Sequence, residues 1–128
     1  MSEHRRPVVL LVDDEPRILS ALRRALRREG YQLVSAETSQ EALRILDENA
    51  VDCVLSDHKM PGMTGLELLA EVARRHPRAA RMLITGWNVE IGTEELARVG
   101  VRVVLSKPWD DAELKSALRA AVEGAAPG

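Results

Sequence analysis

The chain has 128 residues, of which 45% are hydrophobic and 30% are charged, and its formal net charge is −2. This length and composition suit one soluble globular domain that can bury a core. The 18 basic residues alternate with acids and form no run interleaved with aromatic residues, which argues against nucleic-acid binding. The single Cys53 lies in an apolar segment, so we expect a buried, reduced thiol and a cytoplasmic location. The apolar run near the N-terminus is too short for a signal peptide, and no membrane span or targeting is expected.

Apolar and amphipathic segments alternate along the chain. Residues 8–12, VVLLV, form a continuous apolar run, typical of a strand covered on both faces. A helix should follow, with Pro16 in its first turn and Gly30 as its stop. The segment YQLVSAET predicts a second strand, and SQEALRILDEN predicts a second helix with Ser39 as its N-cap.

The same unit continues to five strand and helix pairs. The later strands are predicted in VDCVLSD, ARMLITG and VRVVLSKP. Gly92 interrupts the start of the fourth helix, which suits a segment that shifts between two states. The alternation predicts an α/β fold with a doubly wound, five-stranded parallel sheet and helices on both faces. We expect a tail at residues 1–7, the domain at 8–123, and a tail or linker start at 124–128.

Polar residues stand where the predicted strands end. Asp13 and Asp14 follow the first strand, Asp57 the third, Thr85 the fourth and Lys107 the fifth. Each has an ordinary alternative role, as a helix cap, a strand residue or a solvated strand end. Ligand sites of parallel sheets form at the carboxyl ends of the strands, and carboxylates gathered there repel unless a cation lies among them. The pattern therefore favours a Mg²⁺ site for phosphoryl chemistry.

These five positions, in the segments VDD, SDHKMPGMTG, LITG and LSKPW, resemble the receiver domain of two-component response regulators. The resemblance covers about Val8 to Glu123 and implies the flavodoxin-like (βα)5 fold with strand order 2-1-3-4-5. It implies that Asp57 is the phosphoacceptor. Thr85 would hydrogen-bond a phosphoryl oxygen, and Lys107 would pair with the phosphoryl group.

The resemblance also implies the metal ligands. Asp14 would bind Mg²⁺ directly, Asp13 largely through a water, and Asp57 through its carboxylate. The backbone carbonyl of Lys59 would be the remaining protein ligand, and Mn²⁺ should be able to replace Mg²⁺. Pro61, Gly62 and Gly65 would shape the loop around that carbonyl.

The implied function is signal transduction rather than turnover of a substrate. A sensor histidine kinase would supply the phosphoryl group, and the domain would promote only its own phosphorylation and dephosphorylation. It would then switch conformation, alone or as a phosphorylation-dependent homodimer, to regulate an output domain or a downstream protein. The segments SDHKMPGMTGLELL, ITG and SKPW are similar to those of receivers attached to enhancer-binding transcription regulators, including hydrogenase-gene regulators, or to cyclic-di-GMP phosphodiesterases.

Several neighbours of the site depart from the family pattern or leave alternatives open. Val104 stands where many receivers have a switch aromatic. Trp87 would either cover the pocket or lie at its rim, and Trp109 would either cover the last helix or contact a partner. His58 is expected to point away from the pocket. The family also implies a cis bond before Pro108.

Other functions are less compatible with the same residues. An FMN carrier would need a phosphate-cradling loop where this chain has DDEP, and a haloacid-dehalogenase-type phosphatase needs an acid where this chain has Lys59. A degenerate receiver is disfavoured because every acceptor position is filled. The arginines of the first helix form either a solvated face or a kinase-specific patch; they are Arg17, Arg23, Arg24, Arg27 and Arg28.

Overall fold

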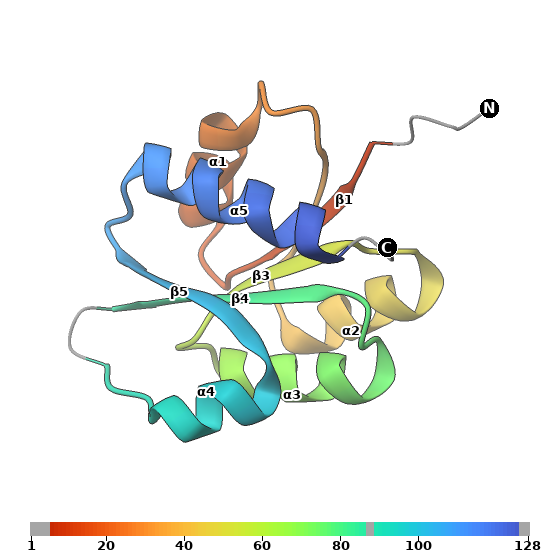
Figure 1. Ribbon diagram of the computed structural model, residues 1–128, viewed down its shortest axis with the longest axis vertical. Helices are drawn as coiled ribbons and strands as arrows, with labels where there is room; N and C mark the ends of the chain where they lie inside the picture. Colours follow the sequence, from red (N-terminus) through yellow and green to blue (C-terminus); the bar gives the residue numbers. More distant parts are fainter. Residues whose placement is uncertain (1–5, 87–88, 126–128) are drawn as a thin grey trace.

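Five parallel strands form one sheet in the computed structural model, which describes residues 6–86 and 89–125 (Figure 1). The strand order is β2-β1-β3-β4-β5, which confirms the predicted α/β fold and strand order. The elements in chain order are β1 (Val8–Val12), α1 (Pro16–Leu26), β2 (Gln32–Ala36), α2 (Ser39–Glu48), β3 (Cys53–Asp57), α3 (Gly65–Arg75), β4 (Ala80–Gly86), α4 (Thr93–Val99), β5 (Val101–Lys107) and α5 (Asp111–Ala125). Within the described ranges, no helix has both the length and the apolar character needed to cross a membrane.

The helices cover both faces of the sheet. Figure 1 shows α1 and α5 on one face and α2, α3 and α4 on the other. Along β1, Val9 and Leu11 belong to the core beneath α1 and α5, whereas Leu10 and Val12 belong to the opposite core. Because successive strand residues point to opposite faces, a strand covered on both sides must be apolar throughout. Burial of each such leucine contributes about 1.5–3 kcal/mol. The two cores therefore stabilise the sheet and the position of its strands.

Two predictions about helix ends are wrong. The N-cap of α2 is Thr38, whose Oγ1 accepts the N–H of Glu41 at 3.0 Å. Ser39 is instead the first helical residue, and its buried hydroxyl donates to the carbonyl of Met63 at 3.3 Å. Helix α1 ends at Leu26, earlier than predicted, and Gly30 follows the turn at residues 27–29 with φ of 88°.

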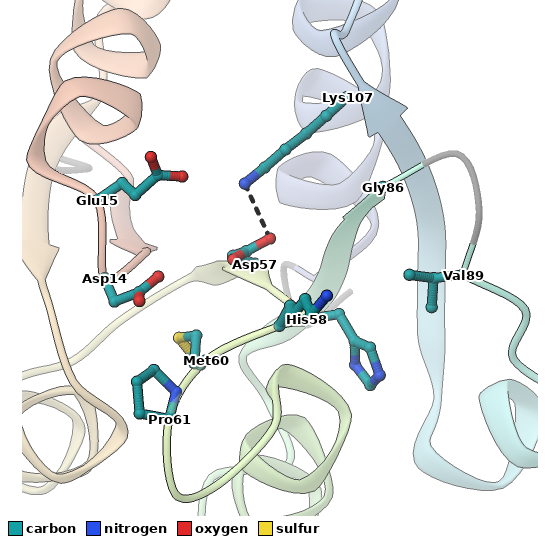
Figure 2. A pocket seen from close by; sticks show the side chains of 10 residues that line it. Asp14, Glu15, Asp57, His58, Met60, Pro61, Gly86, Val89 and Lys107 are labelled. Carbon is teal, nitrogen blue, oxygen red and sulfur yellow. Dashed lines mark ion pairs between the residues drawn. The ribbon is translucent and has the colours of Figure 1, made fainter.

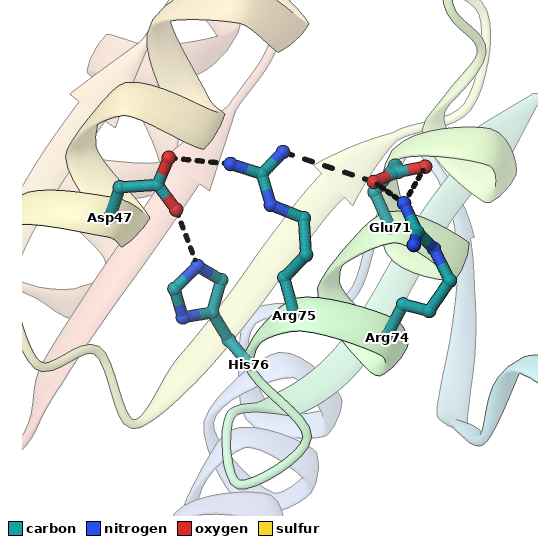
Figure 3. A network of polar contacts seen from close by, with 5 residues as sticks. All are labelled: Asp47, Glu71, Arg74, Arg75 and His76. Carbon is teal, nitrogen blue, oxygen red and sulfur yellow. Dashed lines mark hydrogen bonds and ion pairs between the residues drawn. The ribbon is translucent and has the colours of Figure 1, made fainter.

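A polar network joins the C-terminal ends of α2 and α3 (Figure 3). Asp47 of α2 accepts a hydrogen bond from Arg75 and contacts Nε2 of His76 at 2.8 Å. Glu71 extends the network by pairing with Arg74 at 2.7 Å. These helices run back from the strand ends, so the network lies at the opposite edge of the sheet from Asp57. It holds the two helices together without taking part in the site.

Cys53 lies in the core on the α1 and α5 face and is fully buried. Burial raises the pKa of its thiol to about 12. The thiol therefore stays protonated and packs as a small apolar side chain, as its apolar sequence context predicts.

Candidate functional site

Asp57 and Lys107 meet at the carboxyl edge of the sheet. Nζ of Lys107 lies 3.1 Å from Oδ1 of Asp57 and 3.3 Å from Oδ2 of Asp13 (Figure 2). Asp57 is the last residue of β3, Lys107 is the last residue of β5, and Asp13 directly follows β1. The three residues lie together because these strands are parallel and share one carboxyl edge. Asp13 is 1% exposed and Asp57 is 5% exposed. Lys107 is thus the counter-charge of a buried pair of acids.

The charges of the site perturb one another. Burial is the main reason that the pKa of Asp13 is raised, and the nearby charge of Asp57 adds to it. The N–H of Glu15 opposes this rise by donating to Oδ1 of Asp13 at 2.9 Å. Partial burial disfavours the charge on Lys107, but its hydrogen bond to Asp57 and the two carboxylate charges outweigh burial and raise its pKa. The site therefore has excess negative charge that one ammonium group only partly offsets.

The three aspartates form a group that suits a cation. Asp13, Asp14 and Asp57 each offer a carboxylate oxygen, and these oxygens lie within 4.8 Å of one another. Oxygens bound to one ion at about 2.1 Å are no more than about 4.2 Å apart, so only a small closure would be needed to hold Mg²⁺. The donors are all hard oxygens, as Mg²⁺ prefers. The residues present thus fit this ion.

The site opens to solvent through a cavity of about 550 Å³. Asp14 and Glu15 line one side of it, and Lys107 and Gly86 line another (Figure 2). Glu15 is the N-cap of α1, but its side chain makes no capping hydrogen bond and instead faces this cavity. Lys59 also belongs to the lining. A phosphoryl-sized group has room to reach Asp57.

The loop from β3 to α3 is fixed against Asp57. Gly65 lies so close that a Cβ there would overlap the carbonyl oxygen of Asp57. The N–H of Gly65 donates to the carbonyl of His58 at 2.8 Å. A capping box at Thr64 and Glu67 then starts α3, with both reciprocal hydrogen bonds present. The loop therefore holds the backbone of residues 57–59 in one position beside the acids.

The family model described as the response regulator receiver domain matches residues 9–119 of the chain. The chain belongs to this family. Over 124 residues it is 36% identical to the transcriptional regulatory protein GlrR of Escherichia coli, covering 97% of this chain and 28% of that protein. It is also 36% identical to the hydrogenase transcriptional regulatory protein HoxA of Cupriavidus necator, covering 93% of this chain and 25% of that protein. The receiver domain thus spans about a quarter of the length of these relatives.

The solved structures agree with this assignment. A signal receiver domain of an HD domain-containing protein from Pseudomonas fluorescens Pf-5 has a TM-score of 0.85 and 38% sequence identity. The match covers 94% of this receiver domain and 98% of that chain. Membership of the receiver family argues against the two alternative functions, an FMN carrier and a haloacid-dehalogenase-type phosphatase.

Thr85 of this receiver domain is buried at the end of β4 but does not line the main cavity. It lines a second hollow of about 350 Å³, together with Leu96 and Val104. Val89 lines both the main cavity and this hollow. Val104 is 40% exposed, the one large hydrophobic side chain among the described residues that is so exposed. The position expected to carry a switch aromatic therefore holds an exposed valine beside an open hollow.

The structure shows the contacts of two neighbours of the site, His58 and Trp109. The imidazole of His58 is directed away from the Lys107 and Asp57 pair (Figure 2), and its Nδ1 accepts the N–H of Leu66 at 3.3 Å. This confirms its predicted direction and adds a role at the start of α3 that the sequence does not reveal. Trp109 packs against the core and donates to Asp111 at 3.0 Å, which favours the covering role. Trp87 lies outside the described residues.

The peptide bond between Lys107 and Pro108 is cis, as the family resemblance implies. Asp110 follows and its carboxylate accepts the N–H of Glu113 at 2.9 Å, which begins α5. The end of β5 is thereby tied to the last helix next to Lys107.

Proposed function

We propose that this receiver domain accepts a phosphoryl group on Asp57 from the phosphohistidine of a sensor histidine kinase. The observation that carries the proposal is the 3.1 Å contact between Nζ of Lys107 and Oδ1 of Asp57 at the floor of an open cavity. A carboxylate that is buried, paired with an ammonium and still reachable is suited to nucleophilic attack. Membership of the receiver family supports the same role.

In the proposed step, a carboxylate oxygen of Asp57 forms a bond to phosphorus. The phosphorus–nitrogen bond of the donor breaks, and the donor imidazole keeps the electron pair and takes a proton from water. The product is an acyl phosphate on Asp57. The phosphoryl oxygens gain or retain negative charge throughout, so catalysis consists mainly of positioning and charge stabilisation.

The residues around Asp57 divide these tasks. Lys107 moves its ammonium from the free carboxylate to a phosphoryl oxygen, and the hydroxyl of Thr85 donates to another. Asp13, Asp14, Asp57 and the carbonyl of Lys59 are proposed to hold Mg²⁺, or Mn²⁺ in its place. The bound ion would neutralise charge on the transferred group.

The domain is proposed to act as a switch rather than as an enzyme with external turnover. Lys59 stands where a phosphatase of the haloacid-dehalogenase type needs an acid, which supports this view. Repositioning of Thr85 upon phosphorylation would alter the hollow between Thr85, Leu96 and Val104, and so the surface of α4 and β5. A few kcal/mol of differential stability is enough to shift such an equilibrium.

The output is proposed to be transcription regulation in a longer protein, because GlrR and HoxA are named as transcriptional regulators. A cyclic-di-GMP phosphodiesterase output is the alternative, suggested by the sequence texture alone. The receiver is predicted at residues 8–123 with tails at 1–7 and 124–128; since α5 continues to Ala125, the domain would extend to that residue. It would work in the cytoplasm, where kinases have ATP. Phosphorylation-dependent pairing of two copies would be one route to the output.

Acetyl phosphate tests the proposal directly. The 128-residue chain is incubated with acetyl phosphate and Mg²⁺, and its intact mass is recorded. One phosphoryl adduct is expected on the native chain and on the control Asp47→Asn, and none on Asp57→Asn. An adduct of equal yield on Asp57→Asn would overturn the assignment.

A further inference from the structure

Another hollow, of about 550 Å³ and distinct from the one at Thr85, lies between α1 and β2. Arg6, Arg23, Arg24 and Arg27 line it together with Tyr31. Arg6 precedes β1, and Tyr31 precedes β2, so the hollow lies towards the amino ends of the strands. It is therefore separate from the site at Asp57, which lies at the carboxyl ends. The sequence does not reveal this grouping, because Arg6 and Tyr31 lie outside α1 and come close to it only when the chain is folded.

The arginines of this hollow carry charge that the described part of the protein does not neutralise. Within that part, no carboxylate lies within ion-pair distance of Arg6, Arg24 or Arg27. Some other surface arginines are paired, as Arg119 is with Glu29 at 3.0 Å. Cations gathered around one concavity repel one another, and a bound anion would relieve that repulsion.

Arg23 is held in place rather than free to turn away. Its Nε and Nη2 donate to the hydroxyl of Ser35 at 3.0 and 2.6 Å. Ser35 lies on β2, so this contact fixes the guanidinium against the sheet. A guanidinium fixed in this way loses less entropy when it binds a ligand.

The hollow is shallow and open to solvent, and its volume and lining suit a small anionic ligand. A volume of about 550 Å³ falls in the range of small-molecule sites, which is about 300–1,000 Å³. Guanidinium forks match phosphate oxygens in a bidentate manner. Tyr31 and Leu33 supply an apolar wall of the hollow. Burial raises the pKa of Tyr31, so its hydroxyl stays protonated at neutral pH and can donate a hydrogen bond.

We propose that the hollow between α1 and β2 binds a small molecule that carries two or more phosphate groups. The arginines come from the segment before β1 and from successive turns of α1, so their guanidinium groups are available to more than one phosphate. An extended polyanion suits the surface less well, because Glu37 and Glu41 line the adjoining hollow that Arg23 also borders.

Isothermal titration and amide chemical shifts test this proposal on the 128-residue chain. The probes are inorganic pyrophosphate and adenosine triphosphate, in EDTA and about 0.15 M salt, so that neither metal at Asp57 nor weak surface attraction contributes. Saturable binding is expected, with shifts at residues 20–33 and none at 57–61. Arg24→Gln/Arg27→Gln should weaken binding at least tenfold, whereas the charge-matched control Arg78→Gln/Arg98→Gln should leave it unchanged.

The two probes distinguish the sources of the phosphate groups. Tighter binding of adenosine triphosphate, lost in Tyr31→Leu, would identify a nucleotide, and equal binding would identify a polyphosphate; both support the proposal. No saturation by either probe would overturn it, as would equal losses in the two double variants. Binding only to anionic phospholipid vesicles or to duplex DNA would also overturn it, in favour of a macromolecular surface. None of these results depends on phosphoryl transfer to Asp57.

Discussion

The backbone of Gly65 packs directly against Asp57, so that a side chain at Gly65 has no room. A Cβ there would overlap the carbonyl oxygen of Asp57 and stand 2.8 Å from Cα of His58. Both neighbours are backbone atoms of the loop that carries the site. We therefore expect Gly65→Ala to displace residues 57–59 and to reduce phosphoryl uptake.

The same substitution should lower the free energy of unfolding by about 1–3 kcal/mol, the usual cost of overpacking a closely packed position. Urea unfolding of the two chains measures this loss. Gly92→Ala is the matched control, since a Cβ at Gly92 meets nothing within 4 Å. If Gly65→Ala were as stable and as active as Gly92→Ala, the loop would not be fixed against Asp57 in the manner described.

Metal binding should stabilise the fold. Because the carboxylates of Asp13, Asp14 and Asp57 lie together, Mg²⁺ relieves their repulsion in the folded state only. At a concentration of about 100 Kd the gain would be about 2.7 kcal/mol, seen as a higher midpoint of thermal unfolding. Asp14→Asn should lose most of this gain and Asp47→Asn should keep it. An equal gain in both variants would place the metal elsewhere.

Asp13→Asn should stabilise the metal-free protein at neutral pH. Burial raises the pKa of Asp13, so ionisation of this carboxyl is less favourable in the folded chain than in the unfolded one. A carboxyl group whose pKa is raised by folding contributes stability at pH below its pKa in the unfolded chain, which is 3.8. That contribution is lost as the pH rises through the higher pKa of the folded chain. The variant's advantage in free energy of unfolding should therefore shrink as pH falls towards 3.8. Urea unfolding in EDTA at several pH values measures it, and an advantage that grows at low pH would contradict this origin.

Lys107→Arg should impair phosphoryl uptake although the charge is kept. The compact ammonium lies 3.1 Å from Asp57 and 3.3 Å from Asp13, a position that a broad planar guanidinium cannot occupy in the same way. We expect uptake from acetyl phosphate to be slower by about tenfold or more. Lys115→Arg, on α5, serves as the control and should match the native rate. Native rates in both variants would remove Lys107 from the reaction.

The sequence predicts the fold and the convergence of the strand-end residues well, for a physical reason. Apolar runs such as residues 8–12 mark where strands end, and parallel strands bring their carboxyl ends to one edge. The positions of Asp13, Asp57 and Lys107 follow from this alone. The roles of these residues rest on the family resemblance and remain proposals.

Features that depend on contacts between distant segments were not predictable in this way. Thr38 and Ser39 are adjacent hydroxyl residues, and the contact of Ser39 with Met63 decides which one caps α2. The hydrogen bond between His58 and Leu66 depends on the path of the intervening loop. The arginine-lined hollow likewise requires Arg6 and Tyr31 to meet helix α1 in space.

The most direct test locates the phosphoryl group on a single residue. After reaction with acetyl phosphate and Mg²⁺, borohydride reduces an aspartyl phosphate to homoserine, which peptide mass spectrometry can place. We predict homoserine at Asp57, in the peptide that contains Ser56 to Gly65, and unmodified Asp13 and Asp14. Homoserine at another aspartate, or phosphate retained on His58, would contradict the central claim that Asp57 is the phosphoacceptor.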